Sequence, residues 1–349
     1  MTGPGEAEEL VCTHVERVTH DMKTFVFERA VPRPFRHDPG QHLAFTFDID
    51  GEEVERRYTL ASPPTRPRTA AITVKRVPGG RVSNWLHTRL APGTAVRARG
   101  PLGAFSTARH PAPAYLFLSG GSGVTPLMSM TRALHDLGSP ADVVFAHSAR
   151  TPDDVPFRRE LERIAASGPP RVRVVHVCED GGPPEFRGRL TPGMLRRIAP
   201  DFGAREVFTC GPPGYMRAVR EMLAAACFPM DRYHQESFES AGGTESAERA
   251  APPVPVPVPG GGATYTVALS RTGTSVECAA GTSVLEAAAR AGITLPSSCG
   301  QGMCGSCATT LEKGSVDMRH NGGIRPRDIA RDRILLCCST PLEDLVIDA

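Results

Sequence analysis

The 349-residue chain lacks any apolar run close to the ~20 residues that a membrane-spanning helix needs. Its first ten residues, MTGPGEAEEL, are acidic and hold no apolar stretch of the kind found in secretory signals, so we expect a cytoplasmic protein. The chain also lacks a strong net charge, which is +2, and this argues against nucleic acid or a membrane surface as a partner. With 40% hydrophobic and 22% charged residues, the composition is that of a folded globular protein.

Cysteine is the residue type with the most uneven distribution. Five of the ten cysteines fall within the last 51 residues. Thiols stay reduced in the cytoplasm, so a cluster of them indicates metal binding or catalysis more often than disulfides. We expect four of the others to be buried small apolar residues: Cys12, Cys178, Cys227 and Cys278.

Proline and glycine mark one boundary in the chain. Residues 250–263 read AAPPVPVPVPGGGA, a composition typical of a stiff extended segment followed by a flexible joint. The polar sequence before it extends this linker to residues 240–263. The linker separates a large N-terminal part from a smaller domain at 264–349.

Two different periodicities divide the N-terminal part. Residues 1–110 carry short alternating runs such as KTFVFE and HLAFTFDI between turn signals, which predicts an antiparallel sandwich or barrel. Residues 111–239 carry compact apolar strands such as AYLFLSG and ADVVFAHS, each followed by a helical pattern. That alternation predicts an α/β domain with a parallel sheet covered by helices on both faces.

The C-terminal cysteines have the spacing Cys-x4-Cys-x2-Cys, with a fourth after 29 intervening residues. Tetrahedral zinc sites usually pair cysteines in both halves, and here the fourth has no such mate. Of the neighbours Cys337 and Cys338, only one can face a cluster if both lie in a strand. The region 264–349 resembles a plant-type ferredoxin. The resemblance implies an α+β, β-grasp-like domain with one 2Fe–2S cluster held by Cys299, Cys304, Cys307 and Cys337.

The sequence Arg-Arg-Tyr-Thr-Leu-Ala-Ser at 56–62 offers a cation for phosphate, an aromatic face for a flavin ring and a hydroxyl for its reactive nitrogen. A chance strand with two solvated arginines would also explain it. The segment resembles the R-x-Y-[ST]-x-x-S element of the ferredoxin–NADP reductase superfamily. That resemblance implies flavin contacts from Arg56, Tyr58, Thr59 and Ser62, with Thr59 at the reacting atoms.

A glycine turn at 79–80 precedes a predicted helix, whose N-terminus would attract the flavin pyrophosphate. We assign Gly80, Val82 and Ser83 to this contact, with Ser83 able to cap the helix or touch the phosphate. Residues 100–105, GPLGAF, resemble the loop of FAD-binding members, so FAD is preferred to FMN. Trp85 is expected to pack the helix rather than stack on the flavin.

The string GGSGVTP after the strand AYLFLSG resembles the nucleotide loop of the same reductases. Glycines there let the backbone approach a pyrophosphate at a helix start. The resemblance assigns Gly120, Gly121 and Gly123 to the nucleotide and places Thr125 and Pro126 where nicotinamide and flavin meet.

The string TCGPPG resembles the family's C-G-P element and implies that Cys210, with Gly211 and Pro212, lies beside the nicotinamide; a buried thiol is the alternative. In RYHQESF, Glu236 and Phe238 resemble an E-x-F ending whose aromatic covers the flavin ring.

Recognition of the ribose should lie after the second strand of the nucleotide domain. Ser148 and Arg150 suit a 2′-phosphate, whereas Asp153 and Asp154 do not, so NADH and NADPH both stay open from the residues alone. The resemblance favours NADH.

Together the motifs resemble the reductase components of Rieske-type oxygenases with a C-terminal ferredoxin, a group that includes glycine betaine demethylase reductases and hybrid-cluster-protein reductases. The resemblance implies an FAD-binding β-barrel (1–110), an NAD(P)-binding α/β domain (111–239), a linker (240–263) and a 2Fe–2S domain (264–349). We expect an NAD(P)H-dependent reductase that passes electrons through FAD and the cluster to a terminal oxygenase or another redox protein. A hybrid-cluster-protein reductase, a self-sufficient dehydrogenase of a small molecule and a redox sensor are the alternatives. Residues 264–349 hold eight basic and nine acidic side chains, so their balance does not indicate the acceptor.

Overall fold

A computed structural model describes residues 7–238 and 264–349, with the exception of residues 294, 298, 299, 301, 303, 304, 306, 321, 322 and 325. The chain divides into two compact units, Met1–Phe238 (the N-terminal unit) and Glu239–Ala349 (the C-terminal unit). The predicted linker at 240–263 and the predicted ligands Cys299 and Cys304 lie outside the described residues. Among the described residues, no helix has the length and apolar character needed to cross a membrane.

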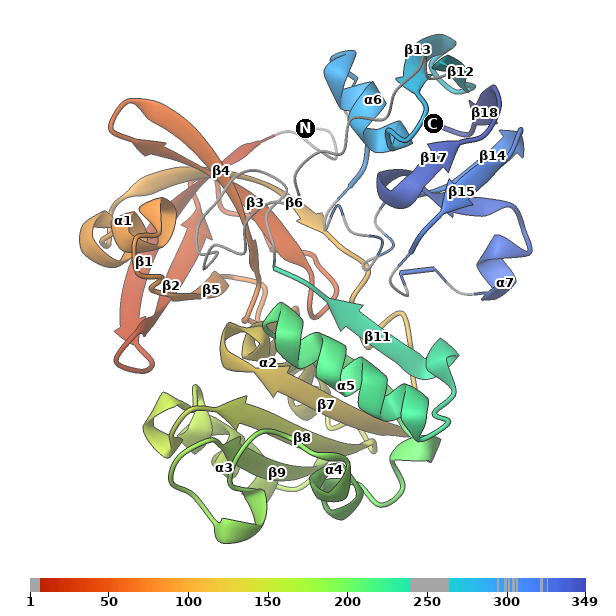
Figure 1. Ribbon diagram of the computed structural model, residues 1–349. Helices are drawn as coiled ribbons and strands as arrows, with labels where there is room; N and C mark the ends of the chain where they lie inside the picture. The colour runs from red at the N-terminus through yellow and green to blue at the C-terminus, as the bar shows by residue number, and fades with distance from the viewer. Residues whose placement is uncertain are drawn as a thin grey trace. The chain divides into compact units, whose positions relative to one another are not determined.

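The N-terminal unit begins with six antiparallel strands in the order β4-β3-β6-β1-β2-β5 (Figure 1). A bridge between Leu60 and Ile72 joins the two edges, so the sheet closes into a barrel rather than a sandwich. The elements are β1 (Glu8–Arg17), β2 (Met22–Arg29), β3 (His42–Ile49), β4 (Glu52–Thr59), β5 (Ala70–Lys75), α1 (Arg81–Arg89) and β6 (Ala95–Leu102).

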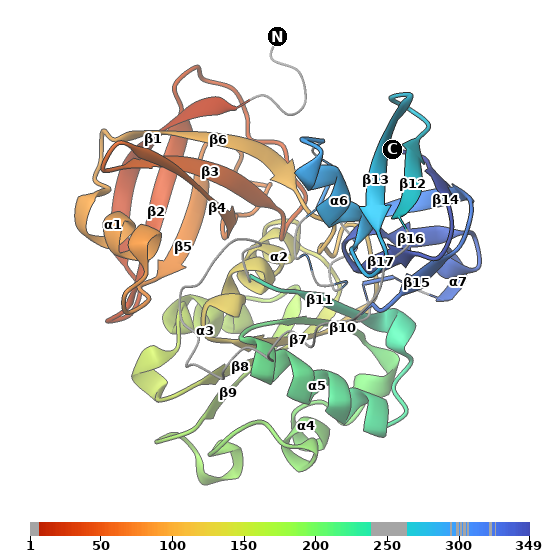
Figure 2. The ribbon, with the colours of Figure 1, turned by 45° about the horizontal axis from the view of Figure 1, so that its top comes forward.

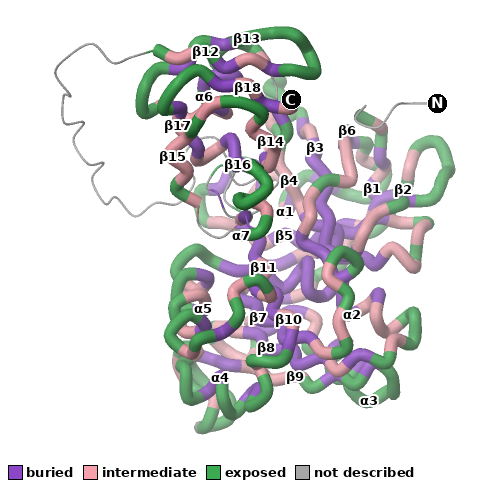
Figure 3. Tube along the Cα trace, turned by 90° about the vertical axis from the view of Figure 1, so that its right-hand side faces the viewer, coloured by how far each residue is buried: buried purple, intermediate pink, exposed green. Residues whose placement is uncertain are grey.

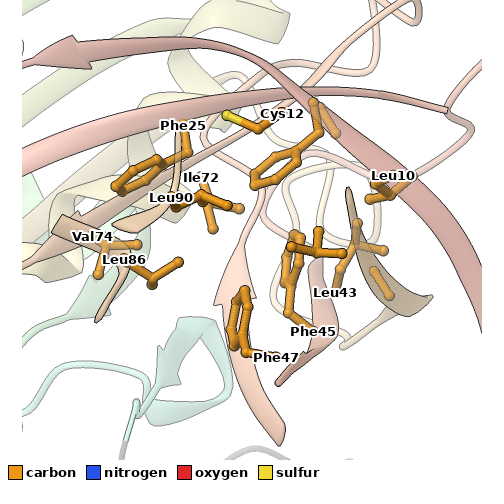
Figure 4. Packing of buried hydrophobic residues seen from close by; sticks show 14 of the residues in the cluster. Leu10, Cys12, Phe25, Leu43, Phe45, Phe47, Ile72, Val74, Leu86 and Leu90 are labelled. Atoms are coloured by element: carbon orange, nitrogen blue, oxygen red, sulfur yellow. The ribbon is translucent and has the colours of Figure 1, made fainter. Parts of the chain in front are cut away.

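Phenylalanines at alternate strand positions fill the barrel (Figure 4). Phe25 and Phe27 come from β2, and Phe45 and Phe47 from β3; each is at most 1% exposed. Each such burial is worth roughly 1.5–3 kcal/mol. The Trp85 ring lies 5.6 Å from that of Phe47, so the expectation that this tryptophan packs α1 against the core is confirmed.

The second part of the N-terminal unit is a parallel sheet in the order β11-β10-β7-β8-β9. Buried residues follow its central strands (Figure 3). Phe117 and Phe145 face the helices α2 and α3, whereas Leu118 and Ala146 face α4 and α5, so both faces are covered as predicted. The elements are β7 (Ala114–Gly120), α2 (Val124–Asp136), β8 (Asp142–Ala149), α3 (Arg158–Ala166), β9 (Arg171–Cys178), α4 (Pro192–Ile198), β10 (Glu206–Cys210), α5 (Pro213–Ala225) and β11 (Tyr233–Glu236).

The C-terminal unit is α+β, as predicted, with a five-stranded mixed sheet in the order β13-β12-β18-β14-β16 and a two-stranded sheet, β15-β17. Its core includes Val267, Leu269 and Val284, the last from helix α6, which lies beside β13 (Figure 2). The elements are β12 (Thr264–Leu269), β13 (Thr274–Ala279), α6 (Val284–Arg290), β14 (Ala308–Lys313), β15 (Val316–Met318), α7 (Pro326–Ile329), β16 (Arg333–Leu335), β17 (Ser339–Pro341) and β18 (Leu345–Ile347).

Two expectations need correction. The segment around Cys337 and Cys338 is not one continuous strand: β16 ends at Leu335, and Leu336–Cys338 form a 3-10 turn, so strand alternation does not apply to the two cysteines. Cys227 is exposed, because it stands at φ 54° just after α5 rather than in the core. Cys12, Cys178 and Cys278 are buried, as expected.

Candidate functional site

The end of β4 holds the most informative hydroxyl of the barrel. Thr59 is 5% exposed, and its Oγ1 has no hydrogen-bond partner among the described residues. A buried hydroxyl in that state costs roughly 1–3 kcal/mol, so Thr59 fits a site where a bound group completes the hydrogen bonding. Ser62 differs, because its Oγ accepts a hydrogen bond from the Ala71 backbone N–H at 2.9 Å and so joins β4 to β5.

Arg56 and Tyr58 are both partly exposed on β4. Arg56 Nη1 donates to the carbonyl of Glu55 at 2.8 Å, and no ion pair with a carboxylate is seen for it in the described part of the chain. Nearby Arg99, in contrast, pairs with Glu55 at 3.0 Å. The charge of Arg56 is therefore available for a phosphate. The Tyr58 ring packs edge-on against Phe45, with centroids 6.1 Å apart.

Helix α1 begins without a side-chain cap at Gly80. Ser83 does not cap it: its Oγ accepts from the Val77 N–H at 3.1 Å and donates to the Gly80 carbonyl at 3.4 Å, which holds the turn in place. The Val82 side chain is 2% exposed and belongs to the barrel core, so only its backbone N–H could serve a ligand. An uncapped helix start of this kind suits an anion.

The glycines of the β7–α2 loop have separate reasons to be glycine. A Cβ on Gly123 would lie 2.1 Å from the Cys210 carbonyl oxygen, so this glycine lets the loop pack on β10. A Cβ on Gly120 would lie 3.3 Å from the side chains of Pro212 and Tyr215, which is a tight contact. Gly121 has φ +54° and open space beside it, which makes it the loop glycine that a phosphate could approach.

Thr125 and Pro126 open α2, and both are buried. The Thr125 hydroxyl donates to the Ser122 carbonyl at 3.1 Å. That bond fixes the side chain within the loop, so Thr125 holds the turn that precedes the helix.

Cys210 ends β10 and is fully buried. Burial raises the pKa of its thiol well above the ordinary value, and the nearby Glu236 raises it further, so the group stays a neutral thiol at pH 7. Gly211 follows closely packed, since a Cβ there would meet the Tyr215 ring at 2.9 Å, and Pro212 stands at the N-cap of α5.

A row of polar residues crosses the parallel sheet at the Cys210 level. Cys210 pairs in register with Glu236 on β11 and with Ser119 on β7, and Ser119 pairs with His147 on β8. Ser119 Oγ and His147 Nδ1 are 2.8 Å apart, and both residues are fully buried. Ser119 and His147 were not among the residues predicted from the sequence, although a polar pair at the ends of two otherwise apolar strands was the available signal.

His42 on β3 connects the barrel to this row of polar residues. Its Nδ1 lies 3.7 Å from Glu236 Oε1, and each residue is 5% exposed. A Cβ on Gly103 would lie 3.1 Å from the same His42 nitrogen, so only glycine fits there. On the barrel side, His42 pairs in register with Thr59. Thr59, His42, Glu236 and Cys210 thus form a continuous chain of neighbours from the barrel to the parallel sheet. His42 was also missed, although its position opposite the Arg-Tyr-Thr strand was the available signal.

The remaining predicted residues lie around this junction. Phe238 is 39% exposed, two residues beyond Glu236. Ser148 is half-buried. The nearby Tyr215 hydroxyl is buried with no hydrogen-bond partner among the described residues, and burial raises its pKa. Arg150 is exposed. Asp154 is committed elsewhere, since its carboxylate accepts from the Thr151 hydroxyl at 2.9 Å and from the Thr151 N–H at 3.1 Å.

In the C-terminal unit, two of the four predicted ligands are described. Cys307 is 3% exposed, and the sulfur of Cys337 accepts a hydrogen bond from the Gly302 N–H at 3.1 Å. The Cys338 thiol instead donates to the Leu335 carbonyl at 3.7 Å. An N–H directed at a cysteine sulfur is typical of iron–sulfur sites, and thiolate donors suit iron, so these residues fit such a cluster.

Comparison with known proteins agrees with this arrangement. Residues 9–107 match the oxidoreductase FAD-binding domain family, 117–221 the oxidoreductase NAD-binding domain family and 267–342 the 2Fe-2S iron-sulfur cluster binding domain family. The glycine betaine monooxygenase reductase subunit of Pseudomonas aeruginosa is 44% identical over 97% of this chain and 94% of its own length. The stachydrine N-demethylase reductase subunit of Rhizobium meliloti is 38% identical over 99% and 97%.

Among solved structures, phthalate dioxygenase reductase, described as a modular structure for electron transfer from pyridine nucleotides to [2Fe-2S], has a TM-score of 0.59 at 27% identity and 98% coverage of both chains. Fold and site together define an NAD(P)H-dependent oxidoreductase with FAD and a 2Fe–2S cluster as cofactors. The chain belongs to the family of flavin and iron–sulfur reductase subunits that includes the subunits from Pseudomonas and Rhizobium.

Proposed function

We propose that this protein is the reductase component of an oxygenase system, taking electrons from NAD(P)H and delivering them to a terminal oxygenase. When bound, FAD converts a two-electron donor into single electrons that the 2Fe–2S cluster can carry. The names of the two relatives, the reductase subunits of glycine betaine monooxygenase and of a stachydrine N-demethylase, support this kind of acceptor. A cytoplasmic location is part of the proposal, because NAD(P)H is supplied there and the described cysteines are all free thiols.

The junction between barrel and parallel sheet carries the proposal. Hydride transfer requires the nicotinamide and the flavin ring to meet, and the residues assigned to the two rings, Thr59 and Cys210, are linked there through His42 and Glu236. In this proposal Thr59 offers its unpaired hydroxyl to the flavin, and neutral Cys210 packs beside the nicotinamide. Phe238 would be the aromatic side chain that packs against the flavin ring.

Phosphate groups would be bound at three places in the N-terminal unit. Arg56 and the uncapped start of α1 serve the flavin, with Tyr58 against its ring. Gly121, at the open turn before α2, serves the nicotinamide nucleotide. Ser148 and Arg150 could contact the ribose or a 2′-phosphate. The Asp154 carboxylate is already hydrogen-bonded to Thr151, so Asp153 is the acidic residue that would favour NADH by binding the ribose hydroxyls.

The test is an anaerobic titration of the purified protein with NADH and, separately, with NADPH, followed by visible absorbance and low-temperature EPR. Bleaching of the flavin together with a rhombic signal of a reduced 2Fe–2S cluster is the expected result. Absence of bleaching with either nucleotide would refute the reductase function.

The cluster ligands can be tested with a matched pair of variants. We propose Cys299, Cys304, Cys307 and Cys337 as ligands, supported by the N–H that Gly302 directs at Cys337. Cys337→Ser is expected to lose the cluster absorbance and its EPR signal, while Cys338→Ser keeps both. The reverse result would make Cys338 the ligand.

A further inference from the structure

The C-terminal unit has an uneven charge distribution that its overall balance conceals. Residues 319–333, the arginine segment, contain five arginines and two aspartates, a net charge of +3. The rest of residues 264–349 contains three basic and seven acidic side chains, a net charge of −4. Five of the eight basic residues of this unit therefore lie in fifteen consecutive positions.

Both ends of the arginine segment are fixed beside the proposed cluster ligands. The backbone N–H of Arg319 donates to the Cys338 carbonyl at 3.0 Å, next to Cys337. The Arg333 guanidinium donates to the carbonyl of Ala308 at 3.1 Å, and Ala308 follows Cys307. The segment thus starts and ends within one residue of two ligands.

The middle of the segment also contacts the part of the chain between Cys299 and Cys307, the cysteine loop. The Gly323 N–H donates to the Gly302 carbonyl at 2.9 Å. A Cβ on Gly305 would lie 2.7 Å from the Gly323 carbonyl oxygen, so the two loops are in close contact. From Gly323 the chain forms α7 and returns through β16 to Cys337, which keeps α7 between two points attached to the cysteine loop.

Two arginines in and just after α7 are exposed to solvent. Arg327 and Arg331 are exposed, and within the described residues neither forms an ion pair. Ile329, between them, is 38% exposed, and few large apolar side chains in the described part of the chain are as accessible. An accessible apolar residue flanked by arginines is typical of a protein-binding surface, in which arginine is enriched.

We propose that the arginine segment is the surface on which the electron acceptor docks, and that the acceptor is a protein presenting an acidic face. The inference rests on the proposed function, because it assumes that electrons pass one at a time from the cluster to a separate protein. Electron transfer needs close approach to the cluster edge, and the charge nearest that edge selects partners of opposite sign and speeds their encounter. The −4 remainder of the unit disfavours approach of an acidic protein from other sides.

The test compares the full-length holoprotein with the double variant Arg327→Gln/Arg331→Gln, with two haem proteins as probes: cytochrome b5, which is acidic, and cytochrome c, which is basic. Binding to each immobilised, oxidised cytochrome is measured first, without NADH. NADH-driven reduction of each is then followed by haem absorbance. At low ionic strength the variant should bind and reduce cytochrome b5 about threefold or more weakly, with cytochrome c unchanged or faster, and the difference should disappear in high salt.

The matched control is Arg271→Gln/Arg290→Gln, which removes two charges from the same unit outside the arginine segment. This control should behave as wild type toward cytochrome b5. Equal effects of the two double variants, or an equal loss for both cytochromes, would overturn the proposal. Reduction of the protein's own flavin and cluster by NADH is recorded for every variant, so failure of the reductase function is seen separately; the binding measurement still decides the docking surface.

Discussion

Thr59 combines two properties that usually exclude one another, burial and an unpaired hydroxyl. A protein keeps such a group when a ligand completes it. We predict that Thr59→Val, which replaces the hydroxyl by a methyl group of similar size, leaves the unfolding free energy of the cofactor-free protein unchanged or raises it by about 1 kcal/mol. Reduction of bound flavin by NADH should slow by about tenfold, the loss in rate that corresponds to one hydrogen bond of about 1.4 kcal/mol.

Chemical denaturation of the apoprotein and stopped-flow flavin bleaching measure the two effects. A loss of stability with an unchanged rate of bleaching would make Thr59 a structural residue.

The surroundings of His147 allow a quantitative prediction of how stability depends on pH. Complete burial lowers the pKa of its imidazole from 6.5 to about 3, so the folded protein holds it neutral. The unfolded chain binds a proton there below about pH 6.5, and the stabilisation present above that pH is lost as the pH falls toward 3. Between pH 6.5 and 5 this single group should remove about 2 kcal/mol of unfolding free energy.

Urea unfolding at several pH values tests this for wild type and His147→Gln, which lacks the titrating ring. The variant should show a shallower fall in stability between pH 6.5 and 5, whatever its absolute stability. An unaltered slope in His147→Gln would mean that other groups dominate the acid sensitivity.

At the scale of elements, one glycine determines how closely the β7–α2 loop packs against β10. Gly123 allows the β7–α2 loop to lie against the Cys210 carbonyl, where a Cβ would be 2.1 Å from the oxygen. Gly123→Ala should therefore lower the unfolding free energy by about 1–3 kcal/mol and weaken NADH binding, since the loop must move away from β10. Gly193→Ala, in α4, where a Cβ would make only an ordinary contact with the Thr191 hydroxyl at 3.9 Å, should instead be neutral or stabilising by up to about 1 kcal/mol.

Thermal unfolding and NADH affinity, measured for the two glycine variants, test this prediction. If Gly123→Ala matched Gly193→Ala in both, the close approach of the loop to β10 would be of no consequence.

Most helices and strands could be predicted from the periodicity of their apolar residues, because each is long enough to show which of its faces are buried. Strands β7 to β10 with their helices followed this rule. Strand β11 was missed: Tyr233–Glu236 is only four residues long and reads as polar, and it becomes a strand through its pairing with β10. The turn at Leu336–Cys338 was missed for a similar reason, since the Leu336 N–H donates to the Cys307 carbonyl, a contact that no local pattern encodes.

The site followed the same division between local and long-range information. Arg56, Tyr58 and Thr59 could be found because they share one strand. His42 and Glu236 meet at 3.7 Å from positions almost two hundred residues apart, so spacing along the chain carries no sign of their contact. Ser83 shows the opposite limit: its identity suggested a helix cap, but its hydroxyl holds Val77 because the turn before α1 brings that N–H closer.

At the scale of the whole molecule, position changes the meaning of a charge count. Eight basic and nine acidic residues in 264–349 gave no indication of a partner. The fold attaches the ends of residues 319–333 to the backbone beside Cys337 and Cys307, so the net charge of +3 in this segment lies next to the proposed cluster ligands.

The two units have separate hydrophobic cores, and this bears on how the functions divide between them. The clusters around Phe45, Phe117 and Leu118 all belong to the N-terminal unit, whereas the cluster around Val267 belongs to the C-terminal unit. Each unit thus buries its own apolar surface and should fold alone.

We predict that a protein ending at Phe238 binds FAD and oxidises NAD(P)H with ferricyanide at a rate near that of the full chain, but no longer reduces cytochrome c. Ferricyanide is small enough to take electrons directly from a flavin, whereas a protein acceptor such as cytochrome c needs the cluster. Cytochrome c reduction at the full-length rate by the truncated protein would show that electrons leave from the N-terminal unit, and the C-terminal unit would then need another role.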